Sequence, residues 1–355
     1  MHVKQKPDAI AELAATHGRM WPVIHACAAA AAVERERITG LVQRLVPADC
    51  SLLVFGSLAR DELTAGSDVD WALLIDGAAS PQHLDAAKAV AQLFKDNPPG
   101  PTQVFGCPVF SHDLVHLIGG DADTNRNTTR RLLLLLESRT LFEHAGVRER
   151  VMRQLLRRYV EEDRGYRAAH DYTVRVPRFL LNDIARFWRT MTVDYASKRR
   201  ERDGGWALRN FKLQVSRKLI YVAGLMMCLS CQLRPVAALK NAGFATEKDF
   251  TDALQDFLLD FSNRTPLQAV SRFALDFNAG ACGAEILDAY DKFLGVLADS
   301  GKRNHLKKLS VEDALSDEVF KEARVIGNEF QDALTKLLFD SDSVLTAATQ
   351  RYGVF

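Results

Sequence analysis

A Gly-Ser pair followed by two aspartates one residue apart is the part of this chain with the most evident chemistry. Ser57 and Asp68 are separated by ten residues, and Asp70 follows after one apolar residue. Residues two apart in an extended segment point to the same face, so both carboxylates project together while Val69 points into the core. Adjacent carboxylates repel unless a cation lies between them, and hard oxygen ligands suit Mg²⁺ or Mn²⁺ bridging to phosphates. The spacing therefore predicts metal binding by both aspartates.

The Gly-Ser pair has the properties of a phosphate-binding turn. Gly56 lets the backbone approach a phosphate closely, and Ser57 offers a hydroxyl and an amide at a helix start, where exposed N–H groups favour anions. Arg60 lies one turn into that helix and can reach a phosphate or pair with Glu62. Ser67, directly before the first aspartate, is a further candidate for nucleotide binding. Together these residues predict a site for a metal-bound nucleotide triphosphate.

Short apolar runs of strand length flank this segment on both sides. Residues 51–55 and 71–75 are expected to be strands, with the Gly-Ser turn and a short helix between them. Residues 8–46 indicate helices broken near residues 21–22, and a helix is expected around residues 82–95. The Pro-rich cluster 97–101 is expected to be a loop.

The quoted residues resemble the nucleotidyltransferase signature of the DNA polymerase β superfamily. Two sequence patterns carry this resemblance: Gly-Ser-x-Ala-Arg-x-Glu from Gly56 and Gly-Ser-Asp-x-Asp from Gly66. They are especially similar to minimal bacterial nucleotidyltransferases and to the catalytic domain of PII uridylyltransferases. The segment LLLLLESRTLF from Leu132 to Phe142 is similar to the Leu-Leu-Glu-Ala-Arg segment that follows that catalytic domain. The resemblance implies an NTP substrate, Mg²⁺ or Mn²⁺ as cofactor, and a small mixed sheet flanked by helices.

One expected acid has no obvious place. The superfamily usually supplies a third carboxylate from a later strand, which binds the catalytic metal and helps deprotonate the attacking hydroxyl. The candidate strand, residues 103–110, contains no acid, and Asp113 just after it is the best candidate. The alternative is that Asp113 caps a helix starting at Leu114. Without a third acid, the protein would be slow, use one metal, or bind nucleotides without turnover.

Length and composition limit the number of domains and the kinds of partner that can be expected. With 355 residues and 47% hydrophobic content, the chain suffices for two domains, which we place at 1–147 (nucleotidyltransferase domain with N-terminal helices) and 148–355 (all-helical domain). The fold class expected is α+β. A net charge of +1 demands neither a nucleic acid nor a membrane partner, although residues 148–218 hold 19 Lys or Arg against 9 Asp or Glu. Six scattered cysteines and no expected membrane-spanning segment favour the cytoplasm.

The helical region offers further candidates for binding anions. A helix over residues 178–191 would place Arg178, Arg186 and Arg189 on one face, which indicates either an anion site or a solvated face neutralised by carboxylates. In related nucleotidyltransferases a helical domain supplies Lys, Ser or Arg to the triphosphate, so Lys212 and Ser216 are candidates. His112 and His116 are one turn apart and indicate pocket-lining or structural roles rather than a metal pair. Cys228 and Cys231 fall in the apolar run 219–233, which indicates a buried helix.

These features predict a nucleotidyltransferase that moves an NMP from an NTP to a hydroxyl of a macromolecule, releasing pyrophosphate. The acceptor is a protein or an RNA 3′ end. The alternatives are a synthase of a nucleotide second messenger and a catalytically weak nucleotide-binding regulatory protein. No membrane partner is expected, and the sequence indicates no oligomeric state.

Overall fold

The computed structural model describes residues 8–100, 104–162, 176–200, 204–233 and 247–353. The chain divides into two compact units, each assembled from segments that are distant in sequence. The sheet unit comprises residues 26–187 and 239–265, and the helical unit comprises residues 1–25, 188–238 and 266–355. The sequence-based boundary between residues 147 and 148 stays a prediction, and the two units are described separately below.

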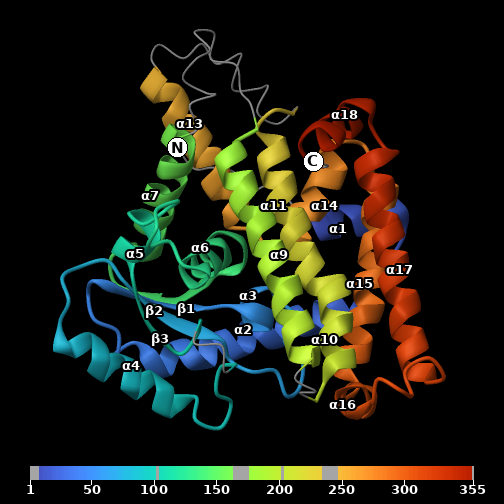
Figure 1. Ribbon diagram of the computed structural model, residues 1–355, viewed down its shortest axis with the longest axis horizontal. Helices are drawn as coiled ribbons and strands as arrows, with labels where there is room; N and C mark the ends of the chain where they lie inside the picture. The colour runs from blue at the N-terminus through green and yellow to red at the C-terminus, as the bar shows by residue number, and fades with distance from the viewer. Residues whose placement is uncertain (1–7, 101–103, 163–175, 201–203, 234–246, 354–355) are drawn as a thin grey trace. The chain divides into compact units, whose positions relative to one another are not determined.

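The sheet unit contains a four-stranded sheet with helices on both sides (Figure 1). Its strands are β1 (Cys50–Val54), β2 (Trp71–Ile75), β3 (Cys107–Phe110) and β4 (Arg139–Glu143). The strand order is β3-β2-β1-β4, with β1 antiparallel to both neighbours and β2 parallel to β3. The helices are α2 (Pro22–Val42), α3 (Gly56–Ala59), α4 (Pro81–Leu93), α5 (Ser111–Val115), α6 (Asn125–Glu137), α7 (Val147–Glu162) and α13 (Glu247–Ser262). A mixed α+β fold with a small sheet is therefore confirmed.

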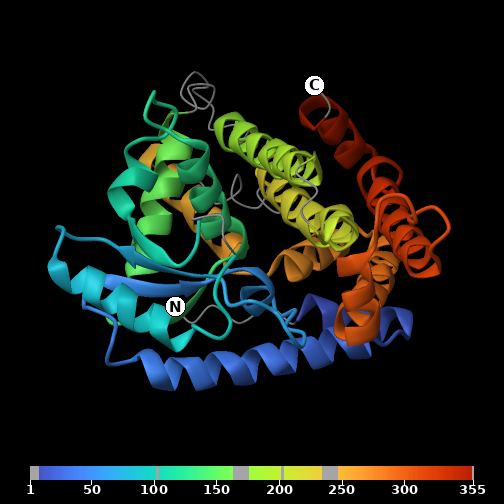
Figure 2. The same cartoon turned by 60° about the horizontal axis from the view of Figure 1, so that its bottom comes forward.

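Strands β1 and β2 are buried along their whole length because both faces of the sheet are covered. Figure 2 shows α2 and α4 beneath the sheet and α6 and α7 above it. The lower face packs Val54, Trp71 and Leu73 into one cluster with apolar residues of α2 and α4. The upper face carries the alternate residues of β1 and β2, including Leu53 and Ala72. This separation of faces decides where the aspartates point.

Three details of this unit differ from the sequence-based expectation. Strand β4 was not predicted, because it is short, only its central residue is buried, and it directly follows the apolar helix α6. Strand β3 begins at Cys107, and residue 103, the first of the expected strand, lies outside the described residues. Helix α5 begins at Ser111, so Asp113 lies in its first turn and does not cap a helix at Leu114.

In the residues that the structure describes, the helical unit contains helices and no strand. They are α1 (Ala9–His17), α9 (Arg178–Arg200, entering from the sheet unit), α10 (Trp206–Lys212), a π-helix η1 (Leu213–Arg217), α11 (Lys218–Ser230), α14 (Pro266–Asp276), α15 (Gly280–Ala298), α16 (Ser300–Lys308), α17 (Glu318–Phe339) and α18 (Ser343–Tyr352). Helix α11 is buried over most of its length, including Cys228, with Cys231 buried at its end, as predicted. None of the described helices combines the length and apolar composition needed to cross a membrane.

Candidate functional site

The Gly-Ser turn rests directly against the second aspartate. Gly56 has a backbone φ of +64°, in the left-handed region that residues with a Cβ rarely adopt. A Cβ at this position would lie 3.0 Å from Oδ2 of Asp70. Both the backbone conformation and the close approach therefore favour glycine at this position. The Asp70 carboxylate also accepts a hydrogen bond from the amide of Gly100, at 3.4 Å.

The two aspartates leave the same side of an extended segment. Asp68 is exposed, Val69 is buried and Asp70 is half-buried, which is the alternation that the sequence predicted. The amide of Phe55 donates to the carbonyl oxygen of Asp70 at 2.9 Å, which continues the β1–β2 pairing by one residue. Because Val69 belongs to the lower-face cluster, both carboxylates point to the upper face. The structure thus brings Gly56 and Asp70 together and leaves Asp68 exposed two residues before Asp70.

Phe105 lies beside Phe55, on the segment that leads into β3. The parallel register pairs Ala72 with Cys107, and the amide of Gly106 donates to the carbonyl oxygen of Trp71 at 2.7 Å. The ring centroid of Phe105 lies 5.3 Å from that of Phe55. Residues 103–110 contain no acid, so β3 supplies no third carboxylate.

Asp113 is placed elsewhere. It follows the end of β3 that pairs with Ile75, whereas Asp70 precedes the start of β2, so the length of that strand separates them. Its side chain is half exposed and lies 3.7 Å from His112. The rings of His112 and His116 lie 5.1 Å apart on the same exposed turn. The topology does not bring Asp113 to the other predicted site residues.

Arg60 is held by two buried carboxylates. Its guanidinium donates to Glu62 at 2.9 Å and pairs with Glu137 at the end of α6. Burial raises the pKa of the Glu137 carboxyl in spite of the opposing effect of Arg60, and the negative charges of Asp70 and Glu62 raise it further. Pairing with Glu62 was foreseen as one option for Arg60, whereas Glu137 was missed. The signal was an acid directly after five consecutive leucines, in a position where a charge is costly to bury.

The residue after Arg60 makes a second set of ion pairs. Asp61 has a φ of +64°, and its carboxylate accepts two hydrogen bonds from the Arg139 guanidinium, at 3.2 and 3.0 Å. Arg35 of α2 approaches the same carboxylate at 2.7 Å and also donates to the carbonyl oxygen of Leu58. These contacts hold a strained residue in place immediately after the Gly-Ser turn.

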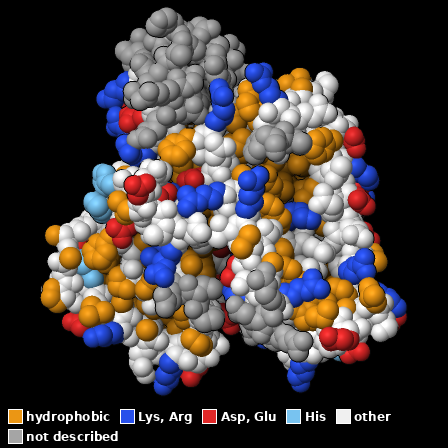
Figure 3. Space-filling model, in the orientation of Figure 1, with side chains coloured by type: hydrophobic (Ala, Val, Ile, Leu, Met, Phe, Trp, Pro, Cys, Tyr) orange, Lys and Arg blue, Asp and Glu red, His pale blue; other side chains and the backbone are white. Residues whose placement is uncertain are grey.

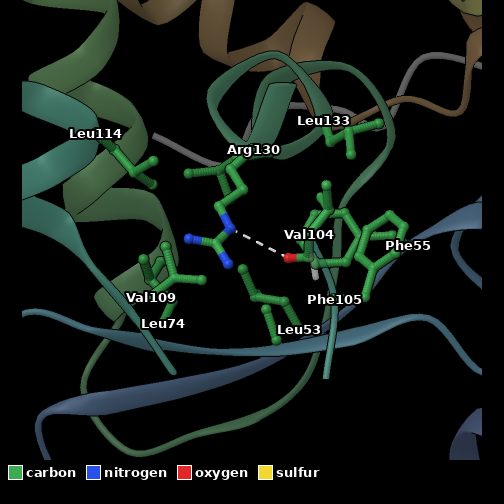
Figure 4. Close-up of a pocket in the computed structure, with 11 residues that line it drawn as sticks. Leu53, Phe55, Leu74, Val104, Phe105, Val109, Leu114, Arg130 and Leu133 are labelled. Atoms are coloured by element: carbon green, nitrogen blue, oxygen red, sulfur yellow. Dashed lines mark hydrogen bonds between the residues drawn. The ribbon is translucent and has the colours of Figure 1, made fainter. Parts of the chain in front are cut away.

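A narrow apolar pocket borders the site on the upper face of the sheet. Figure 4 shows Phe55 and Phe105 on one side of it and Arg130 of α6 reaching across, with its Nε donating to the carbonyl oxygen of Val104 at 3.1 Å. A second guanidinium nitrogen of Arg130 lies 2.9 Å from the sulfur of Cys107. Phe55, which directly precedes the Gly-Ser turn, lines this pocket.

The other predicted ligands have identifiable local contacts. The Ser67 hydroxyl lies 3.2 Å from that of Thr64 and closes the turn before Asp68. Lys212 and Ser216 belong to the helical unit, where Ser216 is buried and its hydroxyl donates to the carbonyl oxygen of Lys212 at 3.2 Å, at the π-helix. Their predicted role in triphosphate binding stays a prediction.

The expected cationic face of α9 is partly neutralised. Arg186 donates to the side chain of Asn125 at 3.0 Å and lies 3.8 Å from the carboxylate of Asp123. Residues 163–175 and 201–203 of the basic stretch lie outside the described residues. On the face shown in Figure 3, the described Lys and Arg side chains are spread among acidic, polar and hydrophobic ones. This distribution favours the solvated alternative for Arg186.

A second group of ligand-type side chains is joined by hydrogen bonds. The Asp49, Cys50 and His83 ligand atoms lie within 4.8 Å of one another. Nδ1 of His83 accepts a hydrogen bond from the Ser80 amide, so the ring proton is on Nε2, which donates to Asp49 at 3.0 Å. Burial and the charge of Asp49 raise the pKa of the Cys50 thiol to about 12. The His83 ring and the Cys50 thiol are thus both hydrogen-bonded to Asp49.

Asp68 and Asp70 fit a divalent cation. Both offer carboxylate oxygens, the ligands that Mg²⁺ and Mn²⁺ prefer, and Asp68 is exposed to solvent. The negative charge of Asp70 helps to raise the pKa of Glu137. The carboxylates of Asp70, Glu62 and Glu137 thus repel one another, and Arg60 pairs with the two glutamates. A cation held by the aspartates would offset this excess of negative charge.

Comparison with known families agrees with this geometry. The family model described as "Putative nucleotidyltransferase DUF294" matches residues 4–97. This part of the chain is similar to nucleotidyltransferases. The matched range contains the Gly-Ser turn, both aspartates and strands β1 and β2, so the resemblance predicted from the sequence is confirmed. No curated protein and no solved structure matched the chain.

Proposed function

We propose that this protein transfers a nucleoside monophosphate from an NTP to a hydroxyl group and releases pyrophosphate, with Mg²⁺ or Mn²⁺ bound by Asp68 and Asp70. The observation that carries the proposal is the close approach of the Gly-Ser turn to the Asp70 carboxylate, which would lie 3.0 Å from a Cβ at Gly56. It places a turn suited to phosphate oxygens beside two carboxylates suited to a cation. The acceptor hydroxyl belongs to a protein or to an RNA 3′ end.

The residues of the chain contribute mainly by position and charge. Asp68 and Asp70 would hold the divalent cation, whose charge would neutralise phosphate oxygens as the transfer proceeds. Gly56 and Ser57 bind the β- and γ-phosphates through backbone amides and the serine hydroxyl. The acceptor oxygen forms a bond to the α-phosphorus while the bond from that phosphorus to the bridging oxygen breaks. Pyrophosphate leaves, and the hydroxyl proton passes to solvent. Alignment of the reacting atoms supplies much of the rate enhancement.

A second candidate is a nucleotide-binding protein without turnover. This candidate is favoured because residues 103–110 contain no acid and Asp113 lies a strand length away from Asp70, so neither supplies a third carboxylate beside it. The Gly-Ser turn and the two aspartates would still bind a metal-bound nucleotide.

Pyrophosphate release separates the two candidates. Wild type is incubated with each NTP and Mg²⁺ or Mn²⁺, with total RNA and a cell lysate as acceptors, beside the Asp68→Asn variant. The transferase predicts release that EDTA and Asp68→Asn both abolish. Nucleotide binding that requires a divalent cation, without any release, would support the binding protein instead.

A further inference from the structure

Two short segments that are distant in sequence are joined by two ion pairs, and each segment supplies the arginine of one pair and the carboxylate of the other. The turn after α3 contributes Arg60 and Asp61, and the junction between α6 and β4 contributes Glu137 and Arg139. Arg60 pairs with Glu137, while Arg139 donates two hydrogen bonds to Asp61. A rigid helix end is thereby fixed to a turn that follows the Gly-Ser pair.

The same turn also closes the Gly-Ser pair through its backbone. The amide of Arg60 donates to the carbonyl oxygen of Gly56 at 3.0 Å, and the amide of Glu62 donates to that of Ser57 at 2.8 Å. Gly56 in turn lies against the Asp70 carboxylate. Backbone hydrogen bonds over one turn of chain therefore join the residue whose guanidinium pairs with Glu137 to the glycine that approaches Asp70.

Stability alone does not account for this arrangement. The side chains of Arg60, Glu62 and Glu137 are 11%, 4% and 5% exposed. Burial of paired charges seldom adds more to folding than uncharged side chains of the same size would. The pKa of Glu137 is raised by burial even beside an arginine, so its ionised form is held at a cost to the folded state.

We propose that Glu137 is a positioning residue for the nucleotidyl transfer: through Arg60 it fixes the Gly56-Ser57 turn at the separation from Asp70 that the reaction requires. The inference rests on the proposed function. In this inference Arg60 pairs with Glu62 and Glu137 and does not contact the nucleotide phosphates.

The test compares Glu137→Gln with Asp183→Asn in the full chain. Asp183 is a matched control, because it is a buried carboxylate that pairs with another arginine of α6, Arg131, at 3.1 Å. Four quantities are measured with each NTP and Mn²⁺: kcat of pyrophosphate release, the nucleotide Kd, the Tm, and hydrogen exchange of the peptide covering residues 55–63.

We expect Glu137→Gln to lower kcat by at least about tenfold, because misplacement of the reacting groups by about 1 Å can cost about 100-fold. The nucleotide Kd changes by less than about threefold, since the aspartates and the turn still bind it, and exchange in residues 55–63 becomes faster. Asp183→Asn lowers the Tm and keeps kcat within about twofold. If Glu137→Gln does not fold, Arg60→Lys replaces it, because an ammonium cannot contact both glutamates in the same way.

The inference is overturned if Glu137→Gln keeps kcat within about twofold of wild type. It is also overturned if Asp183→Asn lowers kcat by the same factor, since the effect would then follow the loss of stability. The proposed function itself would be refuted if wild type neither binds a nucleotide nor releases pyrophosphate. Wild type is therefore measured before any variant is compared.

Discussion

The contact between Gly56 and Asp70 gives the sharpest prediction about the site. Replacing Gly56 with Ala introduces a Cβ at a φ of +64° and 3.0 Å from Oδ2 of Asp70. The left-handed backbone costs a residue with a Cβ about 1 to 2 kcal/mol, so the free energy of unfolding should fall by that amount. The carboxylate must also move away from the turn. Misalignment of this kind should lower the rate of pyrophosphate release by about 10- to 100-fold.

Gly146 provides a matched control in the same unit. Its φ is +62°, but a Cβ there would meet nothing within 4 Å. Gly146→Ala should therefore lose a similar free energy of unfolding, measured by urea denaturation, and keep its rate within about twofold. Equal loss of activity in both variants would refute the argument, because the effect would then come from backbone strain alone. Full activity in Gly56→Ala would refute it as well.

Three further predictions concern titratable groups. Asp70→Asn removes a negative charge near Glu137 and keeps an acceptor for the Gly100 amide, so we expect unchanged or higher stability in urea and no pyrophosphate release. The Cys50 thiol, whose pKa is raised to about 12, should resist iodoacetamide at pH 8 in the folded protein and react only after denaturation, as mass spectrometry of its peptide would show. The folded state raises the pKa of Glu137, so the free energy of unfolding of wild type should fall relative to that of Glu137→Gln as the pH rises above about 4.3. Parallel profiles of unfolding free energy against pH for the two proteins would contradict this.

Much of the site was predictable because its residues are close together in the sequence. Asp68 and Asp70 lie on one segment, and the period of two along a strand fixes their common direction without any knowledge of tertiary structure. The turn glycine and the flanking apolar runs are likewise local signals. For the same reason strands β1 and β2 were placed within one residue of their observed bounds.

The parts that sequence reasoning missed depend on contacts between distant segments. Strand β4 has little apolar pattern of its own and pairs with β1 because tertiary packing brings it there. The interaction of Glu137 with Arg60 spans 77 positions, so no local periodicity reveals it. Asp113 is near Asp70 in the order of elements, but the parallel pairing of β2 and β3 carries it to the far end of the sheet.

Transfer of label from α-³²P NTPs tests the central claim most directly. Wild type and the Asp68→Asn, Asp70→Asn double variant are incubated with each labelled NTP, Mg²⁺ or Mn²⁺, total tRNA and a cell lysate. We predict label in a macromolecular band that is absent with the double variant, and the chemical nature of the band identifies the acceptor as protein or RNA. The same labelled band with the double variant, or no label with any NTP although wild type binds nucleotides, would contradict the claim that these aspartates carry out nucleotidyl transfer.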